Sequence, residues 1–183
     1  MNYLNPEVVG YVENLYRIIK FNKFRKTEKV NFETIIPDNI GHISSIDKVI
    51  HGAGAFSPGS VGTVARPWYM HPAQEDNLLV LHGVREVQLY SRKHGKVETF
   101  SVYPDRILKD GVLLYDEACI FGWPCEVFHR VVSCEKEGSI SLNFAVHTPE
   151  FNVNTCFNIY DLDPETGEYA VIREGYKDQS GMM

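Results

Sequence analysis

The sequence predicts an all-β protein, a sandwich or a barrel, with one helix at its N-terminus. From about Val30 onward, short runs rich in Val, Ile, Phe, Tyr and Thr alternate with turn residues, a cadence typical of antiparallel sheets. Helical periodicity is confined to the first segment. At 183 residues, with no repeat and no low-complexity linker, the chain fits one domain. We therefore expect a single domain over 1–183, with a helical extension over 1–24 and a β-barrel over about 30–175.

The N-terminal helix is predicted from its start signals and its apolar spacing. Asn5 is a favourable N-cap, Pro6 suits the first helical position, and Glu7 suits the positive end of the helix dipole. Apolar residues then recur at helical spacing: Val8, Val12, Leu15, Tyr16 and Ile19. We expect the helix to end near residues 20–22 and to cover the core or a dimer interface.

The strands are predicted from β-branched and aromatic runs that turn residues separate. The expected strands are Ile43–Ile50, Leu78–Leu81, Val84–Tyr90, Val97–Tyr103, Val112–Leu114, Ala118–Phe121, Val127–Cys134, Ser139–His147, Asn154–Tyr160 and Tyr169–Arg173. The hairpin over Asn154–Arg173 either closes its own barrel or that of a partner chain.

Composition limits the classes of function. The chain has 18 Lys and Arg against 24 Asp and Glu, a net charge of −6, which argues against nucleic-acid and anionic-membrane partners. No apolar run approaches the ~18–20 residues of a membrane-spanning helix. The N-terminus lacks the pattern of a secretory signal, so we expect a cytoplasmic protein. The four cysteines form no Cys-x-x-Cys pair and are expected to be reduced thiols.

Two segments place a histidine beside an apolar strand and turn residues. The first, over 68–83, contains His71 and Asp76; the second, over 121–133, contains His129. Strands far apart in sequence converge inside a barrel, so these side chains can meet. Imidazole and carboxylate ligands together suit Zn, Fe, Ni or Mn, and paired histidines also suit general acid–base chemistry.

These segments resemble the two motifs of the cupin superfamily. His71, Asp76 and Gly83 match the second half of the first motif in register, and Pro124 and His129 match the second motif. The chain departs from the family in several positions: Tyr69 stands in place of the first histidine, Asp76 in place of glutamate, and Ala118, Glu126 and Ser133 in place of two glycines and an asparagine. The resemblance covers about half of the chain, and it implies a double-stranded β-helix, the jelly-roll barrel of cupins.

The resemblance implies that His71, Asp76 and His129 bind a divalent metal ion, which is Zn, Fe, Ni or Mn. Strand alternation places Asp76 on one face with Leu78, Val80 and His82. Other readings stay open: the two histidines are structural, or Asp76 is a turn residue and Glu75 replaces it as ligand.

Further residues are assigned to the site or to the surface. Tyr69 and Glu75 are candidate proton carriers, and Gln74 and Arg66 are candidate substrate-binding residues. Trp68 and Trp123 flank the two histidine segments and are candidates for the pocket mouth, although packing alone explains them equally well. Three histidines that lie in turns or at strand ends are expected on the surface: His51, His94 and His147.

Three functions remain in competition. The leading hypothesis is a metal-binding cupin with a small-molecule pocket that acts as a dioxygenase, isomerase or lyase on a small oxygen-rich metabolite. The alternative is a metal-free nucleotide-sugar epimerase or ketoisomerase, with His71 as base and Tyr69 as acid. A third is a barrel that binds a small ligand without catalysis. In each case we expect a small-molecule ligand and a homodimer, because the flanking helix and the hydrophobic edge strands need cover.

Overall fold

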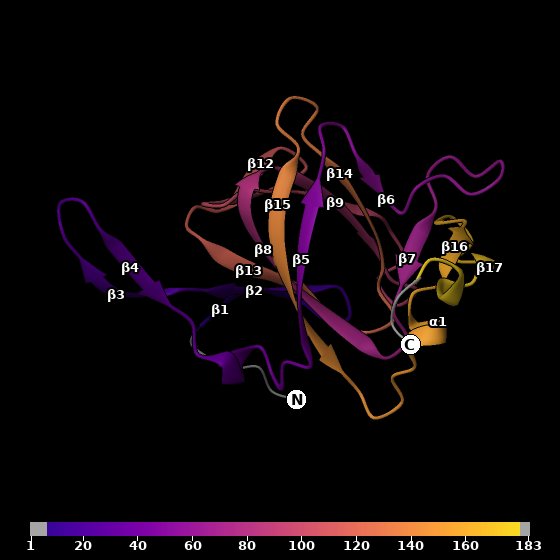
Figure 1. The fold of residues 1–183 in the computed structure, drawn as a ribbon, viewed down its shortest axis with the longest axis horizontal. Coiled ribbons are helices and arrows are strands. Elements are labelled where there is room, and N and C mark those ends of the chain that lie inside the picture. Colours follow the sequence, from indigo (N-terminus) through magenta and orange to yellow (C-terminus); the bar gives the residue numbers. More distant parts are fainter. Residues whose placement is uncertain (1–6, 180–183) are drawn as a thin grey trace.

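The computed structural model describes residues 7–179 and is built almost entirely of antiparallel strands. Two large sheets face each other and enclose a barrel, as Figure 1 shows. The predicted jelly-roll barrel is therefore confirmed. No helix among the described residues is long and apolar enough to cross a membrane.

The first sheet has six strands in the order β1-β2-β13-β8-β15-β5. Their bounds are Val8–Val12 (β1), Tyr16–Lys20 (β2), Cys119–Trp123 (β13), Gln74–Gly83 (β8), Ser139–His147 (β15) and Ser45–His51 (β5). Its inner face carries the polar side chains that form the site described below.

The second sheet has the path β12-β11-β10-β9-β14-β7-β16-β17, and β6 also pairs with β14. The bounds are Phe56–Ser57 (β6), Trp68–Met70 (β7), Arg85–Tyr90 (β9), Glu98–Val102 (β10), Ile107–Lys109 (β11), Val112–Tyr115 (β12), Phe128–Ser133 (β14), Ile159–Leu162 (β16) and Tyr169–Arg173 (β17).

The remaining elements are small. β3 (Asn22–Lys26) and β4 (Asn31–Thr34) form a separate hairpin that extends away from the barrel (Figure 1). Two 3-10 turns, η1 (Pro37–Asn39) and η2 (Gly175–Lys177), and the one-turn helix α1 (Val153–Cys156) complete the fold.

The predicted N-terminal helix is wrong. Asn5 and Pro6 lie outside the described residues, and Glu7 precedes β1, which turns back into β2 through Asn14 at φ 58°. The segment is rich in β-branched and aromatic residues, which suit a pleated surface. β2 also pairs with β13, so Ile18 and Ile19 are buried within the barrel sheet. Tertiary pairing has overridden the helical spacing.

The core lies between the sheets, at the end of the barrel formed by β2, β9, β10 and β13. Its largest fully buried side chains include Phe100 and Phe121, whose ring centroids are 4.7 Å apart. Most of the other members of this cluster are aliphatic, among them Leu15, Ile18, Leu78, Val80, Val87, Leu89, Val102 and Ile107. This apolar packing leaves the other part of the barrel interior free for polar side chains.

A β-bulge changes the face of His82. Along β8, Val80 pairs with Ser141 and His82 with Ile140, so Leu81 is the extra residue. A bulge reverses the alternation of side chains beyond it. His82 therefore points outward, with 58% of its side chain exposed, and the expected common face with Asp76 ends at Val80.

The C-terminal hairpin pairs within its own chain. Ile159 and Tyr160 of β16 pair with Tyr69 and Trp68 of β7, so this hairpin extends the chain's own second sheet. The strand expected over Asn154–Tyr160 is wrong in its first half, where Asn152 caps the short helix α1 instead.

Candidate functional site

A cavity of about 220 Å³ lies inside the barrel, between the two sheets. Most of the lining residues have a polar atom in their side chain, although most of the lining surface is apolar: Asp47, Val49, His51, Ser57, Tyr69, His71, Gln74, Asp76, Leu78, Arg85, Trp123, His129, Val131, Asn143 and Phe157. The volume is below the ~300–1,000 Å³ of pockets for drug-sized ligands, so it suits a ligand of about the size of one sugar ring.

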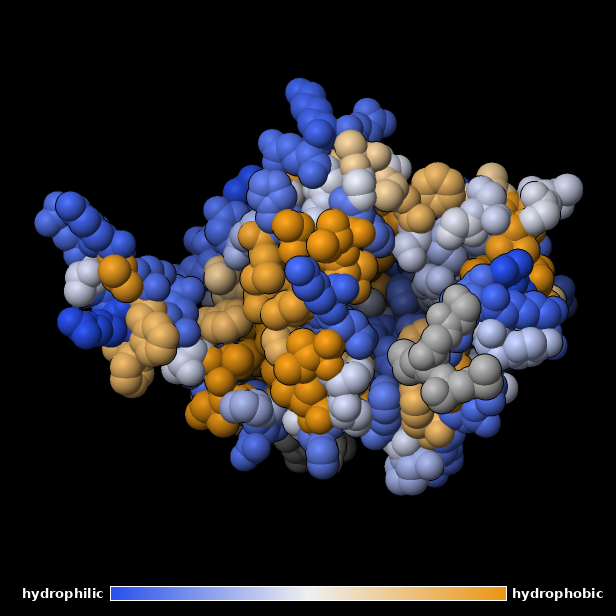
Figure 2. All heavy atoms as spheres, viewed as in Figure 1, coloured by the Kyte–Doolittle hydropathy of each residue, from blue (hydrophilic) through white to orange (hydrophobic). Residues whose placement is uncertain are grey.

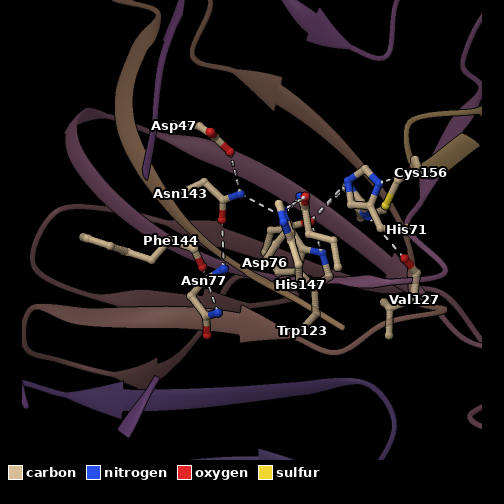
Figure 3. A network of polar contacts seen from close by, with 12 residues as sticks. Asp47, His71, Asp76, Asn77, Trp123, Val127, Asn143, Phe144, His147 and Cys156 are labelled. Atoms are coloured by element: carbon tan, nitrogen blue, oxygen red, sulfur yellow. Dashed lines mark hydrogen bonds and ion pairs between the residues drawn. The ribbon is translucent and has the colours of Figure 1, made fainter. Parts of the chain in front are cut away.

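Asp76 is the centre of a hydrogen-bond network (Figure 3). It faces inward from β8 and is only 3% exposed. Its Oδ1 accepts from Asn143 Nδ2 at 2.7 Å and from Gln74 Nε2 at 2.8 Å, and its Oδ2 accepts from Trp123 Nε1 at 3.1 Å. Trp123 is the residue directly opposite Asp76 on β13. These neutral donors hold an ionised carboxylate in one orientation.

Two buried histidines converge on this carboxylate. His71 follows β7, and its Nδ1 donates to the Cys156 carbonyl at 2.6 Å. His129 lies on β14, and its Nδ1 donates to the Val127 carbonyl at 3.2 Å. Both Nε2 atoms therefore face Oδ2 of Asp76, at 3.4 Å and 3.7 Å respectively. The backbone thus fixes the tautomer of each ring.

Burial and charge set the protonation of the cluster. Burial raises the pKa of Asp76, but the attraction of His71 and His129 and the hydrogen bonds from Gln74 and Asn143 outweigh it, so this pKa is lowered. Burial, with repulsion from His71, lowers the pKa of His129 to about 4. At neutral pH Asp76 is therefore ionised and His129 is neutral.

This geometry brings three electron-rich atoms together. One ligand atom each of His71, Asp76 and His129 lies within 4.8 Å of the others. Lone pairs on two imidazole nitrogens and a carboxylate oxygen repel one another unless a proton or a cation lies between them. The arrangement therefore suits two chemistries, proton transfer through a histidine–carboxylate pair and the binding of a divalent cation.

Tyr69 stands beside both histidines. It is directly opposite His129 on the neighbouring strand, and its ring centroid is 6.0 Å from those of His71 and His129. Burial raises the pKa of Tyr69, and the hydrogen bond with Ser57 opposes this only in part. The phenol therefore keeps its proton at neutral pH and can act as an acid.

Gln74 supports Asp76 from the same strand. Its Nε2 is occupied by Asp76, and its Oε1 lies 3.0 Å from Nε2 of His147. His147 in turn stacks on Phe151, with ring centroids 3.5 Å apart. Gln74 thus orients the Asp76 carboxylate, and both polar atoms of its amide already have hydrogen-bond partners within the protein.

The structure does not bring two of the predicted site residues into the cavity. Glu75 points to the opposite face of β8 from Asp76, where its Oε2 pairs with Arg17 at 3.0 Å. Arg66 lies over the Phe56 ring at 5.4 Å, and its carbonyl accepts from Arg130. Neither residue lines the cavity among the described residues.

Several residues of the cavity were missed by the sequence interpretation. Asn143 is fixed by the backbone N–H of Asn77, which donates to its Oδ1 at 2.8 Å. His51, expected on the surface, faces inward from β5, and Arg85 is buried at the start of β9. Alternation with the cavity-facing residues of β5, β9 and β15 is the signal that could have identified them.

Comparison with known proteins gives a result at the level of the fold. The chain matches no protein-family model and no curated protein sequence. Among solved structures it is similar to the dTDP-4-dehydrorhamnose 3,5-epimerase from Elizabethkingia anophelis NUHP1, with 14% identity, 75% of this chain and 70% of that chain covered, and a TM-score of 0.54.

Two further enzymes have similar structures. The TDP-quinovose 3,4-ketoisomerase WlaRB from Campylobacter jejuni has 13% identity, with 80% of this chain and 92% of that chain covered and a TM-score of 0.50. The rmlC epimerase of Mycobacterium tuberculosis has 10% identity, with 75% of this chain and 64% of that chain covered and a TM-score of 0.50. The chain therefore shares the cupin-type barrel fold of sugar epimerases and ketoisomerases.

Proposed function

We propose that this chain is an epimerase or ketoisomerase that moves a proton at a carbon next to the carbonyl of a nucleotide-linked sugar. The observation that carries the proposal is the buried pair of His71 and Asp76 with the neutral Tyr69 phenol beside it, in a cavity of about 220 Å³. The barrel fold shared with sugar epimerases and a ketoisomerase supports this alternative over the metal-binding hypothesis.

The roles follow from the positions of the protons. Because the Nδ1–H of His71 is held by the Cys156 carbonyl, Nε2 is the atom free to take a proton from the substrate carbon. The ionised Asp76, 3.4 Å from this Nε2, stabilises the imidazolium that forms. The electron pair of the broken C–H bond passes to the carbonyl oxygen as an enolate. For epimerisation, Tyr69 donates its phenol proton to the opposite face of the same carbon. For ketoisomerisation, Tyr69 protonates the carbonyl oxygen to give an enediol; the neighbouring hydroxyl then returns a proton to the Tyr69 phenolate while the His71 imidazolium delivers its proton to the former carbonyl carbon.

Hydrogen exchange tests this proposal directly. The full chain is incubated with dTDP-4-dehydrorhamnose in D₂O, at comparable concentrations of protein and sugar. The sugar is expected to incorporate deuterium at the carbon next to its carbonyl group, and NMR follows this exchange. His71→Asn is expected to slow the exchange about 10²–10⁴-fold. Tyr69→Phe is expected to slow formation of the epimer or ketoisomer by a similar factor, because exchange on the face of His71 does not require the Tyr69 proton. His82→Asn is the matched control, because His82 is 58% exposed on the outer face. Exchange that is absent from the wild type, or equal in all variants, would contradict the proposal; ligand binding without exchange would support a non-catalytic barrel.

A second candidate function is that of a metal-binding cupin, and the convergence of three ligand atoms within 4.8 Å favours it. The residues fit a divalent cation, because both Nε2 atoms and a carboxylate oxygen are aimed at one point and each Nδ1–H is held by a backbone carbonyl. Such an ion supplies Lewis-acid polarisation of a carbonyl when bound. Elemental analysis of untagged protein, with the His71→Ala/His129→Ala variant as control, separates this function from the metal-free one.

We also propose that the chain is a homodimer. Phe24 and Phe32 of the projecting hairpin are 69% and 52% exposed, with ring centroids 5.1 Å apart. The outer face of β5, β15 and β8 is mostly apolar (Figure 2), although the exposed Lys48 interrupts it, and Ile46, Ile50 and Leu81 on it are at least half exposed. A second copy would cover such surfaces. Light scattering is expected to give twice the chain mass of 20.9 kDa, and a mass near 20.9 kDa at micromolar concentration would contradict the proposal.

A further inference from the structure

A second polar cluster lies in the same cavity, away from His71, Asp76 and His129. Arg85, at the start of β9, lines the cavity and is only 4% exposed. Its Nε donates to Ser139 Oγ at 3.1 Å, and its Nη2 reaches the Val49 carbonyl at 3.4 Å. Within residues 7–179 its Nη1 has no hydrogen-bond partner. Hydrogen bonds thus hold the guanidinium through Nε and Nη2, and its Nη1 is left to donate to a ligand.

The charge of Arg85 has no counterion in the described part of the chain. None of the ion pairs between described residues includes it, and burial alone lowers its pKa, to about 10. It therefore remains charged at neutral pH. A buried cation without an anion is costly unless a ligand supplies the opposite charge. Arg85 is also the only Lys or Arg among the described residues that line this cavity.

Neutral polar groups surround the guanidinium. Ser133 Oγ lies 2.7 Å from Ser139 Oγ and 3.0 Å from Nδ1 of His51. Burial and the nearby charge of Arg85 lower the pKa of His51 to about 4, so this ring is neutral at pH 7. The group thus combines one positive charge with uncharged imidazole and hydroxyl groups.

We propose that Arg85, together with His51, which Ser133 holds in place, forms a subsite for one carboxylate group of the substrate. The planar fork of a guanidinium matches the two oxygens of a carboxylate. A single cation neutralises a monoanion, whereas a phosphate dianion would leave charge unpaired near Asp47 and Asp76, which also line the cavity. A carboxylate is therefore the anion that fits.

The two clusters suit opposite ends of one small ligand. His129 and Ser133 lie four residues apart on the same face of β14, which places their Cα atoms ~13 Å apart along the strand. A sugar acid bound through its carboxylate at Arg85 would extend its ring toward His71 and Tyr69. This statement of substrate class rests on the proposed function, whereas the binding of the carboxylate does not depend on catalysis.

Binding of a matched pair of sugars to the full chain tests the subsite. Calorimetric titration is expected to show that D-glucuronate binds, and that D-glucose, which lacks the carboxylate, binds about 10- to 100-fold more weakly. Arg85→Met is expected to remove this difference. Arg130→Met is the matched control, because Arg130 lies on the outer face over the Trp68 ring. Equal binding of the two sugars, an unchanged preference in Arg85→Met, or tighter binding of inorganic phosphate than of glucuronate would overturn the proposal.

Two more variants keep the test decisive. If Arg85→Met does not fold, Arg85→Lys retains the charge but loses the fork, and it is expected to weaken glucuronate binding while leaving glucose binding unchanged. His71→Asn is expected to keep the preference for glucuronate over glucose, although it loses deuterium exchange. Exchange that is absent both from dTDP-4-dehydrorhamnose and from a keto sugar that carries a carboxylate, while glucuronate binding is intact, would contradict the proposed reaction and leave the subsite supported. Glucuronate binding that is lost in His71→Asn but kept in both Arg85 variants would overturn the subsite alone.

Discussion

Replacing Asp76 by Asn tests the organisation of the site most directly. The three donors around Asp76 come from Gln74, Asn143 and Trp123, and a carboxylate accepts all three. An amide has one oxygen only. If that oxygen faces Gln74 and Asn143, the new Nδ2 meets the indole N–H of Trp123 and leaves this buried donor without a partner. The reverse orientation is worse, because the Nδ2 then meets two donors.

The magnitude follows from this single lost acceptor. A buried donor without a partner costs about 1–3 kcal/mol, so we expect Asp76→Asn to lower the free energy of unfolding by that amount at pH 7. The loss of the charge that stabilises the His71 imidazolium is expected to slow deuterium exchange about 10²–10⁴-fold. Urea unfolding measures the first quantity and NMR the second.

A matched control separates the network from the general effect of removing a charge. Asp47→Asn changes a carboxylate on the same cavity wall, whose one hydrogen bond to the network within residues 7–179 is the 3.5 Å contact with Asn143. We expect its stability and exchange rate to stay near those of the wild type. An Asp76→Asn protein that matches the wild type in both measurements would refute the reasoning from the three donors.

Three further predictions concern other parts of the barrel. Glu98→Gln is expected to lower the free energy of unfolding by about 2 kcal/mol in thermal or urea unfolding. Burial raises the pKa of Glu98, but hydrogen bonds from Lys109, Lys96 and His94 outweigh it and lower this pKa to about 2. This contribution to stability is present above about pH 4.5 and is lost as the pH falls toward 2. The free energy of unfolding is expected to fall as the pH drops from 6.5, the pKa of His51 in the unfolded chain, toward 4, its pKa in the fold, because only the unfolded chain binds the proton in this range. His51→Gln is expected to reduce this dependence of stability on pH, measured by urea unfolding. Gly83→Ala is expected to destabilise the fold more than an ordinary surface change, because Gly83 has φ 70° and an added Cβ would lie 2.1 Å from the Gly138 carbonyl oxygen; equal melting temperatures would contradict this.

The parts of the structure that the sequence predicts are those with a local signature. Strands such as β9, β14 and β15 show β-branched runs bounded by turn residues, and they occur close to their expected bounds. The convergence of His71, Asp76 and His129 was expected from the cupin motif spacing, and the structure brings these side chains together. Their roles as metal ligands stay predictions.

The sequence-based predictions are wrong where strand pairing or burial between distant parts of the chain determines the structure. Residues 8–19 have apolar side chains at helical spacing, yet β2 pairs with β13, which lies about a hundred positions further along the chain, and this pairing has no local signal. His51 and Arg85 look like ordinary polar residues near turns, and only closure of the barrel makes them face its interior. The bulge at Leu81 likewise depends on the partner strand β15.

The indole of Trp123 offers an optical view of the site. The chain has only two tryptophans, and the other, Trp68, lies on the outer face beneath the Arg130 guanidinium at 4.1 Å. A Trp68→Phe protein would therefore emit from one fluorophore, whose N–H is bonded to the Asp76 carboxylate. Any ligand, proton or ion that alters the charge of Asp76 would change the emission of that fluorophore. Occupancy of the cavity could thus be followed in real time, without a label and without turnover.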